Sequence, residues 1–105
     1  MRKGAEWMTR PADDSILELL REYGNLTPTA VGVLSEGDLS QSHVGNRLPT
    51  LAKYGMTGRI ARGLYYISEI GLAWLDEEVD ASELPERDEP LGPEDAPAFV
   101  YVTDE

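Results

Sequence analysis

The acidic residues are concentrated at one end of this chain, and that end cannot form a hydrophobic core. Residues 1–75 carry eight basic and eight acidic side chains, whereas residues 76–105 carry twelve acidic and one basic, so the net charge of −11 lies entirely in the last 30 residues. Four of the seven prolines lie there too. We therefore expect one folded domain over residues 7–79 and an acidic, proline-rich, flexible tail over residues 80–105.

Within this tail, the sequence FVYV at residues 99–102 is an exception. Its four residues favour extended structure, and they are a candidate for adding to a sheet edge or binding a partner.

Two helices are predicted before residue 40. The first covers residues 11–23: Pro11 suits a first helical position, the apolar residues have helical spacing, and Gly24 ends the helix. The second is short, with Thr27 as its N-cap, Pro28 in its first turn and Gly37 as its stop.

A third helix is predicted from Ser40, its N-cap, to Gly55. Its buried side is formed by Val44, Leu48 and Leu51. Its other side is polar and free of acid, and consists of Gln41, Ser42, His43, Asn46, Arg47, Thr50 and Lys53. An interior proline removes a backbone hydrogen bond, so we expect Pro49 to kink this helix or divide it in two.

Two strands are predicted over residues 56–61 and 64–68, around a tip that contains Arg62 and Gly63. A fourth helix follows, with Ser68 as its cap and apolar residues around much of its circumference. The predicted fold is therefore mainly α with a small β-hairpin: a three-helix core, a hairpin and a C-terminal helix.

This order of elements resembles a winged helix-turn-helix DNA-binding domain. The resemblance covers about residues 7–76 and is carried by WMTRPADDSILELL and VGNRLPTLAKYGMTGRIARGLYYISEIGLAWL. The stretch LYYISEIGLAWL, a strand leading into Ser-Glu-x-Gly-x-x-x-Leu, is its most specific part. The chain is similar to the haloarchaeal winged-helix regulators related to the repressor of the halophage phi-H, whose pattern it leaves at Pro49.

The resemblance implies that the third helix enters the major groove of double-stranded DNA and that the hairpin, or wing, contacts the backbone or the minor groove. The candidate residues on the recognition helix are Ser40, Gln41, Ser42, His43, Asn46, Arg47, Thr50 and Lys53. Asn46 is expected to pair with adenine and Arg47 with guanine. The candidate DNA-binding residues on the wing are Arg59, Arg62 and Gly63. A merely solvated helix face is the alternative interpretation.

The expected function is a sequence-specific transcriptional regulator, specifically a homodimeric repressor that acts by promoter occlusion. The expected dimer interface consists of Trp7, Met8, Ile16, Leu20, Leu72, Trp74 and Leu75. The alternative is a winged-helix module that binds protein, with the acidic tail as a functional part.

Other classes of function are disfavoured by composition. One histidine and no cysteine leave few ways to build a nucleophile or a metal centre, so we expect no enzyme, no metal, no cofactor and no small-molecule effector. No apolar run is long enough to span a membrane, and no signal peptide is expected, which suits a cytoplasmic protein. Seven arginines against two lysines, together with the acidity, favour a salt-adapted source such as a halophilic archaeon.

Overall fold

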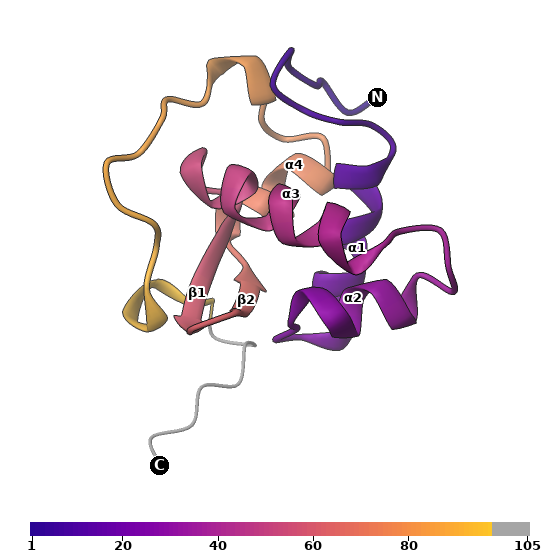
Figure 1. The fold of residues 1–105 in the computed structure, drawn as a ribbon. Helices are drawn as coiled ribbons and strands as arrows, with labels where there is room; N and C mark the ends of the chain where they lie inside the picture. Colours follow the sequence, from indigo (N-terminus) through magenta and orange to yellow (C-terminus); the bar gives the residue numbers. More distant parts are fainter. Residues whose placement is uncertain (98–105) are drawn as a thin grey trace.

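The computed structural model describes residues 1–97. Figure 1 shows four α-helices and one antiparallel hairpin, which confirms the predicted class. The elements are α1 (Ala12–Tyr23), α2 (Pro28–Leu34), α3 (Gln41–Lys53), β1 (Thr57–Ala61), β2 (Leu64–Ile67), α4 (Glu69–Leu75) and the short 3₁₀ turns η1 (Ala81–Glu83) and η2 (Pro93–Asp95).

Side-chain caps define where three of the helices begin. The side-chain oxygens of Thr27, Ser40 and Ser68 accept hydrogen bonds from backbone N–H groups in the first turns of α2, α3 and α4. Each cap satisfies a donor that the helix itself leaves unpaired. All three caps are as the sequence predicts.

Pro49 does not divide α3, which is one helix through that residue. Its ring is exposed to solvent rather than directed at the core. The cost of the lost backbone bond is offset by Val44, Leu48 and Leu51, which are fully buried on the opposite side.

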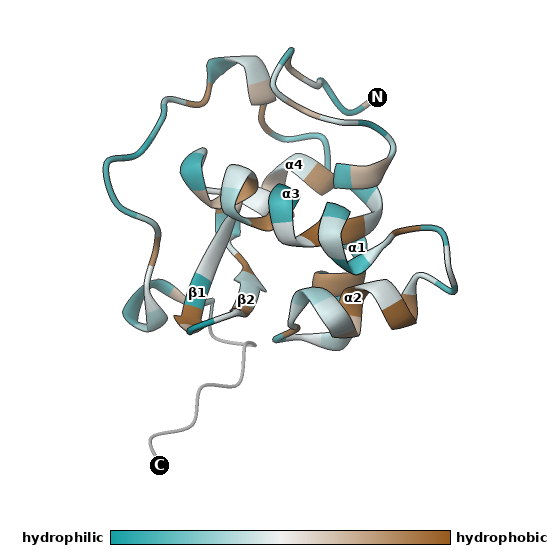
Figure 2. Ribbon diagram, viewed as in Figure 1, coloured by the Kyte–Doolittle hydropathy of each residue, from teal (hydrophilic) through white to brown (hydrophobic). Residues whose placement is uncertain are grey.

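The core lies where α1, α3, α4 and the hairpin meet. Ile16 and Leu20 of α1, Leu48 of α3 and Trp74 of α4 are all 0% exposed. In Figure 2, hydrophobic positions colour the parts of α1, α3 and α4 that approach one another, whereas the chain beyond η1 is mostly hydrophilic.

This core corrects the predicted dimer interface. Ile16, Leu20 and Trp74 are fully buried within one chain, and Leu75 is 3% exposed, so none of them is accessible to a second copy. The indole of Trp74 also donates to the Lys3 carbonyl. The N-terminal segment and α1 therefore pack on the part of α4 that contains Trp74 and Leu75.

Single residues of distant segments extend the hairpin on both sides. Leu26 exchanges two backbone hydrogen bonds of 2.9 Å with Tyr65 of β2. On the other side, Leu91 forms a parallel bridge with Gly58 of β1, and its carbonyl accepts from the Arg59 N–H at 2.8 Å. The free edge of β1 is therefore partly paired by the C-terminal part of the chain.

The domain extends beyond the predicted limits at both ends. Residues 80–97, expected to be flexible, follow a defined path along the folded body, as the orange-to-yellow segment in Figure 1 shows. Ala81 is fully buried, and its N–H donates to the Lys3 carbonyl. The Arg87 N–H donates to the Lys53 carbonyl at the end of α3. Residues 99–102 lie outside the described residues.

Candidate nucleic-acid interface

The solvent side of α3 carries most of the predicted base-contacting residues. Gln41, Ser42, Asn46, Pro49 and Lys53 are exposed. His43 and Thr50 are half-buried, and the Thr50 hydroxyl donates to the Asn46 carbonyl. Ser40 uses its hydroxyl oxygen as the helix cap. The helix and the hairpin contribute no acid to this surface, since no aspartate or glutamate occurs between residues 39 and 68.

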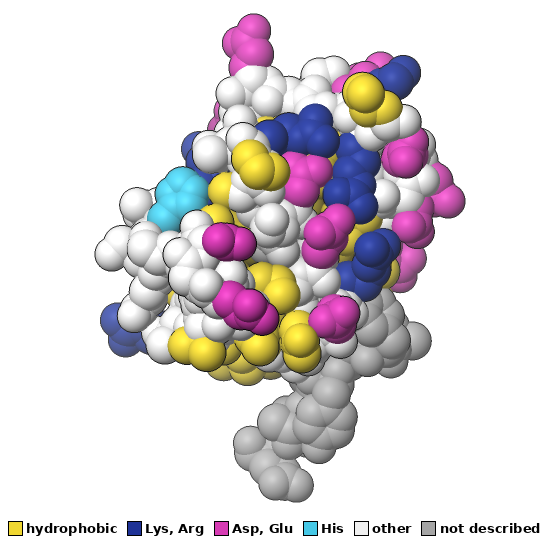
Figure 3. Space-filling model, turned by 90° about the vertical axis from the view of Figure 1, so that its right-hand side faces the viewer, with side chains coloured by type: hydrophobic (Ala, Val, Ile, Leu, Met, Phe, Trp, Pro, Cys, Tyr) yellow, Lys and Arg dark blue, Asp and Glu magenta, His cyan; other side chains and the backbone are white. Residues whose placement is uncertain are grey.

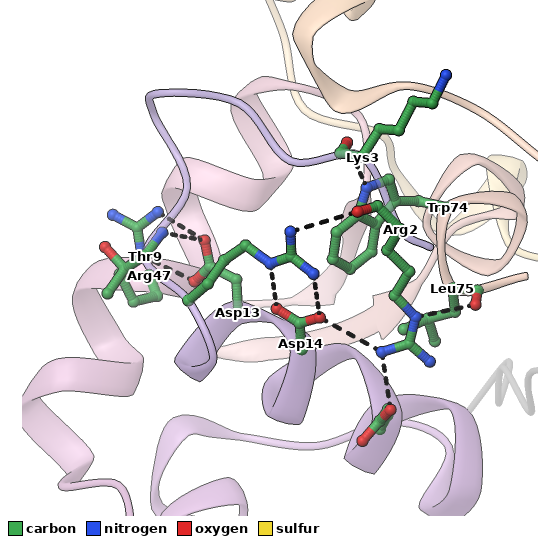
Figure 4. A network of polar contacts seen from close by, with 10 residues as sticks. Arg2, Lys3, Thr9, Asp13, Asp14, Arg47, Trp74 and Leu75 are labelled. Carbon is green, nitrogen blue, oxygen red and sulfur yellow. Dashed lines mark hydrogen bonds and ion pairs between the residues drawn. The ribbon is translucent and has the colours of Figure 1, made fainter. Parts of the chain in front are cut away.

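Arg47 does not belong to this exposed surface. Its Nε donates to Oδ1 of Asp13 at 2.9 Å and its Nη2 to Oδ2 at 2.8 Å, as Figure 4 shows. Nη2 also donates to the Trp7 carbonyl at 2.9 Å. The side chain is 14% exposed, and that of Asp13 is fully buried. The hydrogen bonds that Arg47 donates to Asp13 raise the pKa of its guanidinium, which is therefore charged.

The energetics keep Arg47 in this position, which corrects its predicted role. Removing one partner of a buried ion pair typically costs about 3–5 kcal/mol, because the other charge stays buried and unpaired. A bidentate contact with a base gives about 1–3 kcal/mol of discrimination. Leaving Asp13 for a guanine is therefore unfavourable, and in this structure Arg47 holds α3 against α1 rather than presenting its guanidinium on the exposed face.

The sequence contained a signal for this pair. Asp13 stands three, four and seven residues before Ile16, Leu17 and Leu20, so it lies on the same buried stripe of α1. Arg47 similarly lies beside Leu48 and Leu51 on the edge of the buried stripe of α3. A charged residue on such a stripe indicates a partner in the interior.

A second polar cluster joins the N-terminal segment to α1 and α4. Arg10 donates to both carboxylate oxygens of Asp14, and Arg2 donates to Asp14 and to the Leu75 carbonyl (Figure 4). Both guanidiniums also lie near the ring of Trp74, at 5.7 Å for Arg2 and 5.2 Å for Arg10. Burial alone would raise the pKa of Asp14, but the two arginines hold it below its usual value. Apart from the four-residue spacing of Arg10 and Asp14, no sequence pattern predicts these contacts.

Trp7 and Met8, the other predicted contacts of a dimer, are half-buried within the chain. The ring of Trp7 stacks on Tyr54, with centroids 4.0 Å apart and planes 5° from parallel. Trp7, Met8 and the half-buried Leu72 pack against the core. None of the three is fully covered.

The wing places two arginines at the surface. Arg59 is exposed, and its guanidinium lies 5.9 Å from the ring centre of Tyr65. Arg62 is exposed at the tip beside Gly63, whose φ of 75° lies in the region that glycine favours. Among residues 1–97, neither guanidinium takes part in an ion pair.

The recognition helix and the wing face the same side. Pro49 and Lys53 of α3, Arg59 of β1 and Tyr65 of β2 line one open hollow of about 200 Å³. Arg87 and Pro90 of the C-terminal segment line the same hollow. The C-terminal part of α3 and the two strands of the wing therefore contribute side chains to one shared surface.

The C-terminal strap, which we define as residues 85–92, brings acid to the edge of this surface. Glu86 lies 3.7 Å from the ammonium group of Lys53. Asp88 and Glu89 are exposed on the same strap, so the strap carries three exposed carboxylates, of which Glu86 contacts the end of α3. On the face of the molecule that Figure 3 shows, acidic and basic side chains are interspersed.

In the described part of the chain, residues 1–97, no helix is long and apolar enough to cross a bilayer. Among curated proteins, no sequence matches this chain.

The comparisons with known families and solved structures agree with the geometry. The family of winged helix-turn-helix phage repressors matches residues 1–87. The crystal structure of the PhiH1 repressor-like protein from Haloarcula marismortui is similar, with 38% identity and a TM-score of 0.75. The match covers 83% of this chain and 98% of the Haloarcula chain. The match to the family model extends over most of the sequence, and this chain therefore belongs to the winged helix-turn-helix phage repressor family.

Proposed function

We propose that this chain is a sequence-specific double-stranded DNA-binding transcriptional regulator, with a binding rather than a catalytic function. The observation that carries the proposal is the shared hollow between α3 and the wing, lined by Pro49, Lys53 and Arg59. The acid-free side of α3 would enter the major groove, and the wing would lie along the adjacent backbone.

Different residues would contact the bases and the phosphates, according to their chemistry. Asn46 and Gln41 offer amides to base edges, and Ser42 offers a hydroxyl. Arg62 at the wing tip and Arg59 beside the hollow would contact phosphates or the minor groove, where positive charge is favoured. Phosphate contacts fix position and register, whereas the base contacts carry the sequence preference.

In its more specific form, the proposal is a homodimeric repressor that occludes a promoter. Membership of a repressor family supports repression. One recognition helix contacts few base pairs, and helix-turn-helix dimers double the site through two half-sites. Most residues of the predicted dimer interface are buried within one chain, so they are not available for a contact between copies. Light scattering with and without operator DNA tests the stoichiometry.

Salt dependence bears on how such a protein would bind. With about four phosphate contacts in each of two subunits, log K would fall with log salt at a slope near −7. At the molar salt of a halophilic cytoplasm, counterion release then supplies little affinity. Base hydrogen bonds and apolar contact would carry more of it, so we expect a shallower slope than the arginine count suggests.

The test is selection of duplexes from a random pool, followed by affinity measurements on two variants. Arg62→Ala should weaken binding to all sequences and reduce the salt slope by about one per subunit. Asn46→Ala should weaken the selected sequence only. The matched control is Arg21→Ala, because Arg21 is exposed but pairs with Asp76 away from α3 and the wing. Identical binding by Arg62→Ala, Asn46→Ala and wild type would contradict the proposal.

A second candidate is a winged-helix module that binds protein. It is favoured by the pairing of Leu91 with β1, since this edge already accepts an extended segment. A chain ending at residue 84 would keep the buried Ala81 and remove the strap. If this shortened chain ignores DNA in the selection and binds an extended peptide, the second candidate replaces the first.

A further inference from the structure

The exposed side of α3 presents amides and an apolar ring over its first three turns, but no free guanidinium. The exposed residues there are Gln41, Ser42, Asn46 and Pro49. Arg47, the one arginine of this helix, is held by Asp13 and by the Trp7 carbonyl. The bases that this face can distinguish follow from the groups that remain.

The two amides match adenine. In the major groove adenine presents an acceptor, N7, beside a donor, N6, and a side-chain amide supplies the complementary donor and acceptor. Asn46 and Gln41 are exposed, and within residues 1–97 neither side-chain amide is engaged in a hydrogen bond. Both are therefore available for such a contact.

Pro49 matches thymine. Its exposed ring has no donor or acceptor to offer, and the methyl group of thymine is the apolar feature of the major groove. Asn46 and Pro49 stand three residues apart, so their side chains are neighbours on one face of the helix. A helix former at position 49 would leave this surface with a different shape.

The remaining cations are badly placed to contact guanine. Guanine presents two acceptors and is best matched by arginine or lysine. Lys53 is the last residue of α3 and pairs with Glu86, whereas base contacts come mainly from the N-terminal part of a recognition helix. Arg59 and Arg62 lie on the wing.

We infer that the operator half-site presents adenine–thymine pairs to the first three turns of α3, with an adenine paired to Asn46 and a thymine methyl against Pro49. The inference rests on the proposed DNA-binding function and adds the base composition of its target.

The experiment uses the full chain and a random duplex pool, and then changes single atoms of the selected sequence. Replacing one adenine by 7-deazaadenine removes N7 and should weaken binding about tenfold, the size of one good bidentate base contact. In Asn46→Ala the same replacement should have no further effect. Replacing thymine by deoxyuridine should weaken wild type and leave Pro49→Ala unchanged. Thr29→Ala, at an exposed position of α2, is the matched control and should respond as wild type does.

Two results would overturn the inference without touching the proposed function. One is an enriched sequence in which Asn46→Ala relaxes the preference at a guanine–cytosine pair. The other is an enriched sequence whose preferences are the same in Asn46→Ala, Pro49→Ala and wild type. If the pool yields no enriched sequence at all, the proposed function itself fails.

Discussion

Asp13 and Arg47 form a buried ion pair that joins the beginning of α1 to the middle of α3. Both carboxylate oxygens accept hydrogen bonds from the guanidinium, at 2.9 and 2.8 Å. The Thr9 N–H donates to the same carboxylate at 3.0 Å. The rotation of α3 about its own axis, and thus the residues that it exposes, is fixed by a contact with α1.

We expect Arg47→Ala to destabilise the fold by about 3–5 kcal/mol, because it leaves the Asp13 carboxylate buried and unpaired. Urea unfolding measures this change. In the double variant Asp13→Leu/Arg47→Met both charges are gone, and most of the stability should return. Arg21→Gln breaks the exposed pair with Asp76 and should change stability by less than about 1 kcal/mol. A loss in Arg47→Ala no larger than in Arg21→Gln would contradict the buried-pair argument.

Gly71→Ala should be destabilising, and Gly45→Ala should not, although both glycines are helical. A Cβ at residue 71 would lie 2.4 Å from the Met56 carbonyl oxygen, and backbone cannot move away cheaply. We expect a loss of about 1–3 kcal/mol from this overpacking. A Cβ at residue 45 would meet nothing within 4 Å, so alanine should add about 0.5–1 kcal/mol through helix propensity. Thermal unfolding of the two variants compares them directly, and equal midpoints would refute the contrast.

The elements were predictable because their signals are local. Thr27, Ser40 and Ser68 act on N–H groups two or three residues away, so sequence alone shows where those helices begin. The role of Arg47 depends on Asp13, which is 34 residues distant. Helical spacing assigns Arg47 to the polar face of the helix. Spacing alone does not show that Asp13 of another helix lies opposite Arg47 in the folded chain.

The path of the strap was not predictable from composition. The average acidity and proline content of this segment favour a flexible tail, and the segment does contain few apolar residues. The segment is held instead by a few contacts whose partners are scattered: the Lys53 carbonyl, the β1 edge at Arg59, and the Tyr66 hydroxyl. A hydropathy pattern does not show which backbone groups at a strand edge are free to bind another segment.

Tyr66 should make stability depend on pH in the alkaline range. Its hydroxyl donates to the Gly92 carbonyl at 2.6 Å, and burial, together with Asp95 and Glu94, raises its pKa to about 12. A raised pKa means that the folded state favours the neutral phenol. The resulting stabilisation is complete below the unfolded value near 10 and is lost as pH rises to about 12.

Unfolding of wild type and Tyr66→Phe at several pH values measures this effect. Phenylalanine should lower stability by about 0.5–1.5 kcal/mol near neutral pH through the lost hydrogen bond. The difference in unfolding free energy between Tyr66→Phe and wild type should shrink between pH 10 and 12, because only wild type loses the stabilisation by the neutral Tyr66 phenol there. A constant deficit at all pH values would show that Tyr66 does not titrate in the folded state as stated.

Neutralising the acids of the strap should strengthen DNA binding. The strap hydrogen-bonds the end of α3 through the Arg87 N–H, and Glu86 pairs with Lys53, so its carboxylates lie where phosphates would approach. We expect the triple variant Glu86→Gln/Asp88→Asn/Glu89→Gln to bind several-fold more tightly at low salt. The gain should shrink as salt rises, because repulsion between exposed charges is screened. Titration in KCl measures both quantities.

The control for this variant separates local repulsion from net charge. Glu22, Glu78 and Glu83 are also exposed, and their replacement by glutamine removes the same three charges near the end of α1, the end of α4 and η1. Because those positions lie away from α3 and the wing, this control should gain much less affinity. Equal gains in the two triple variants would mean that overall charge alone opposes binding. In that event, the Glu86 contact with Lys53 would have no particular role in limiting access to the recognition helix.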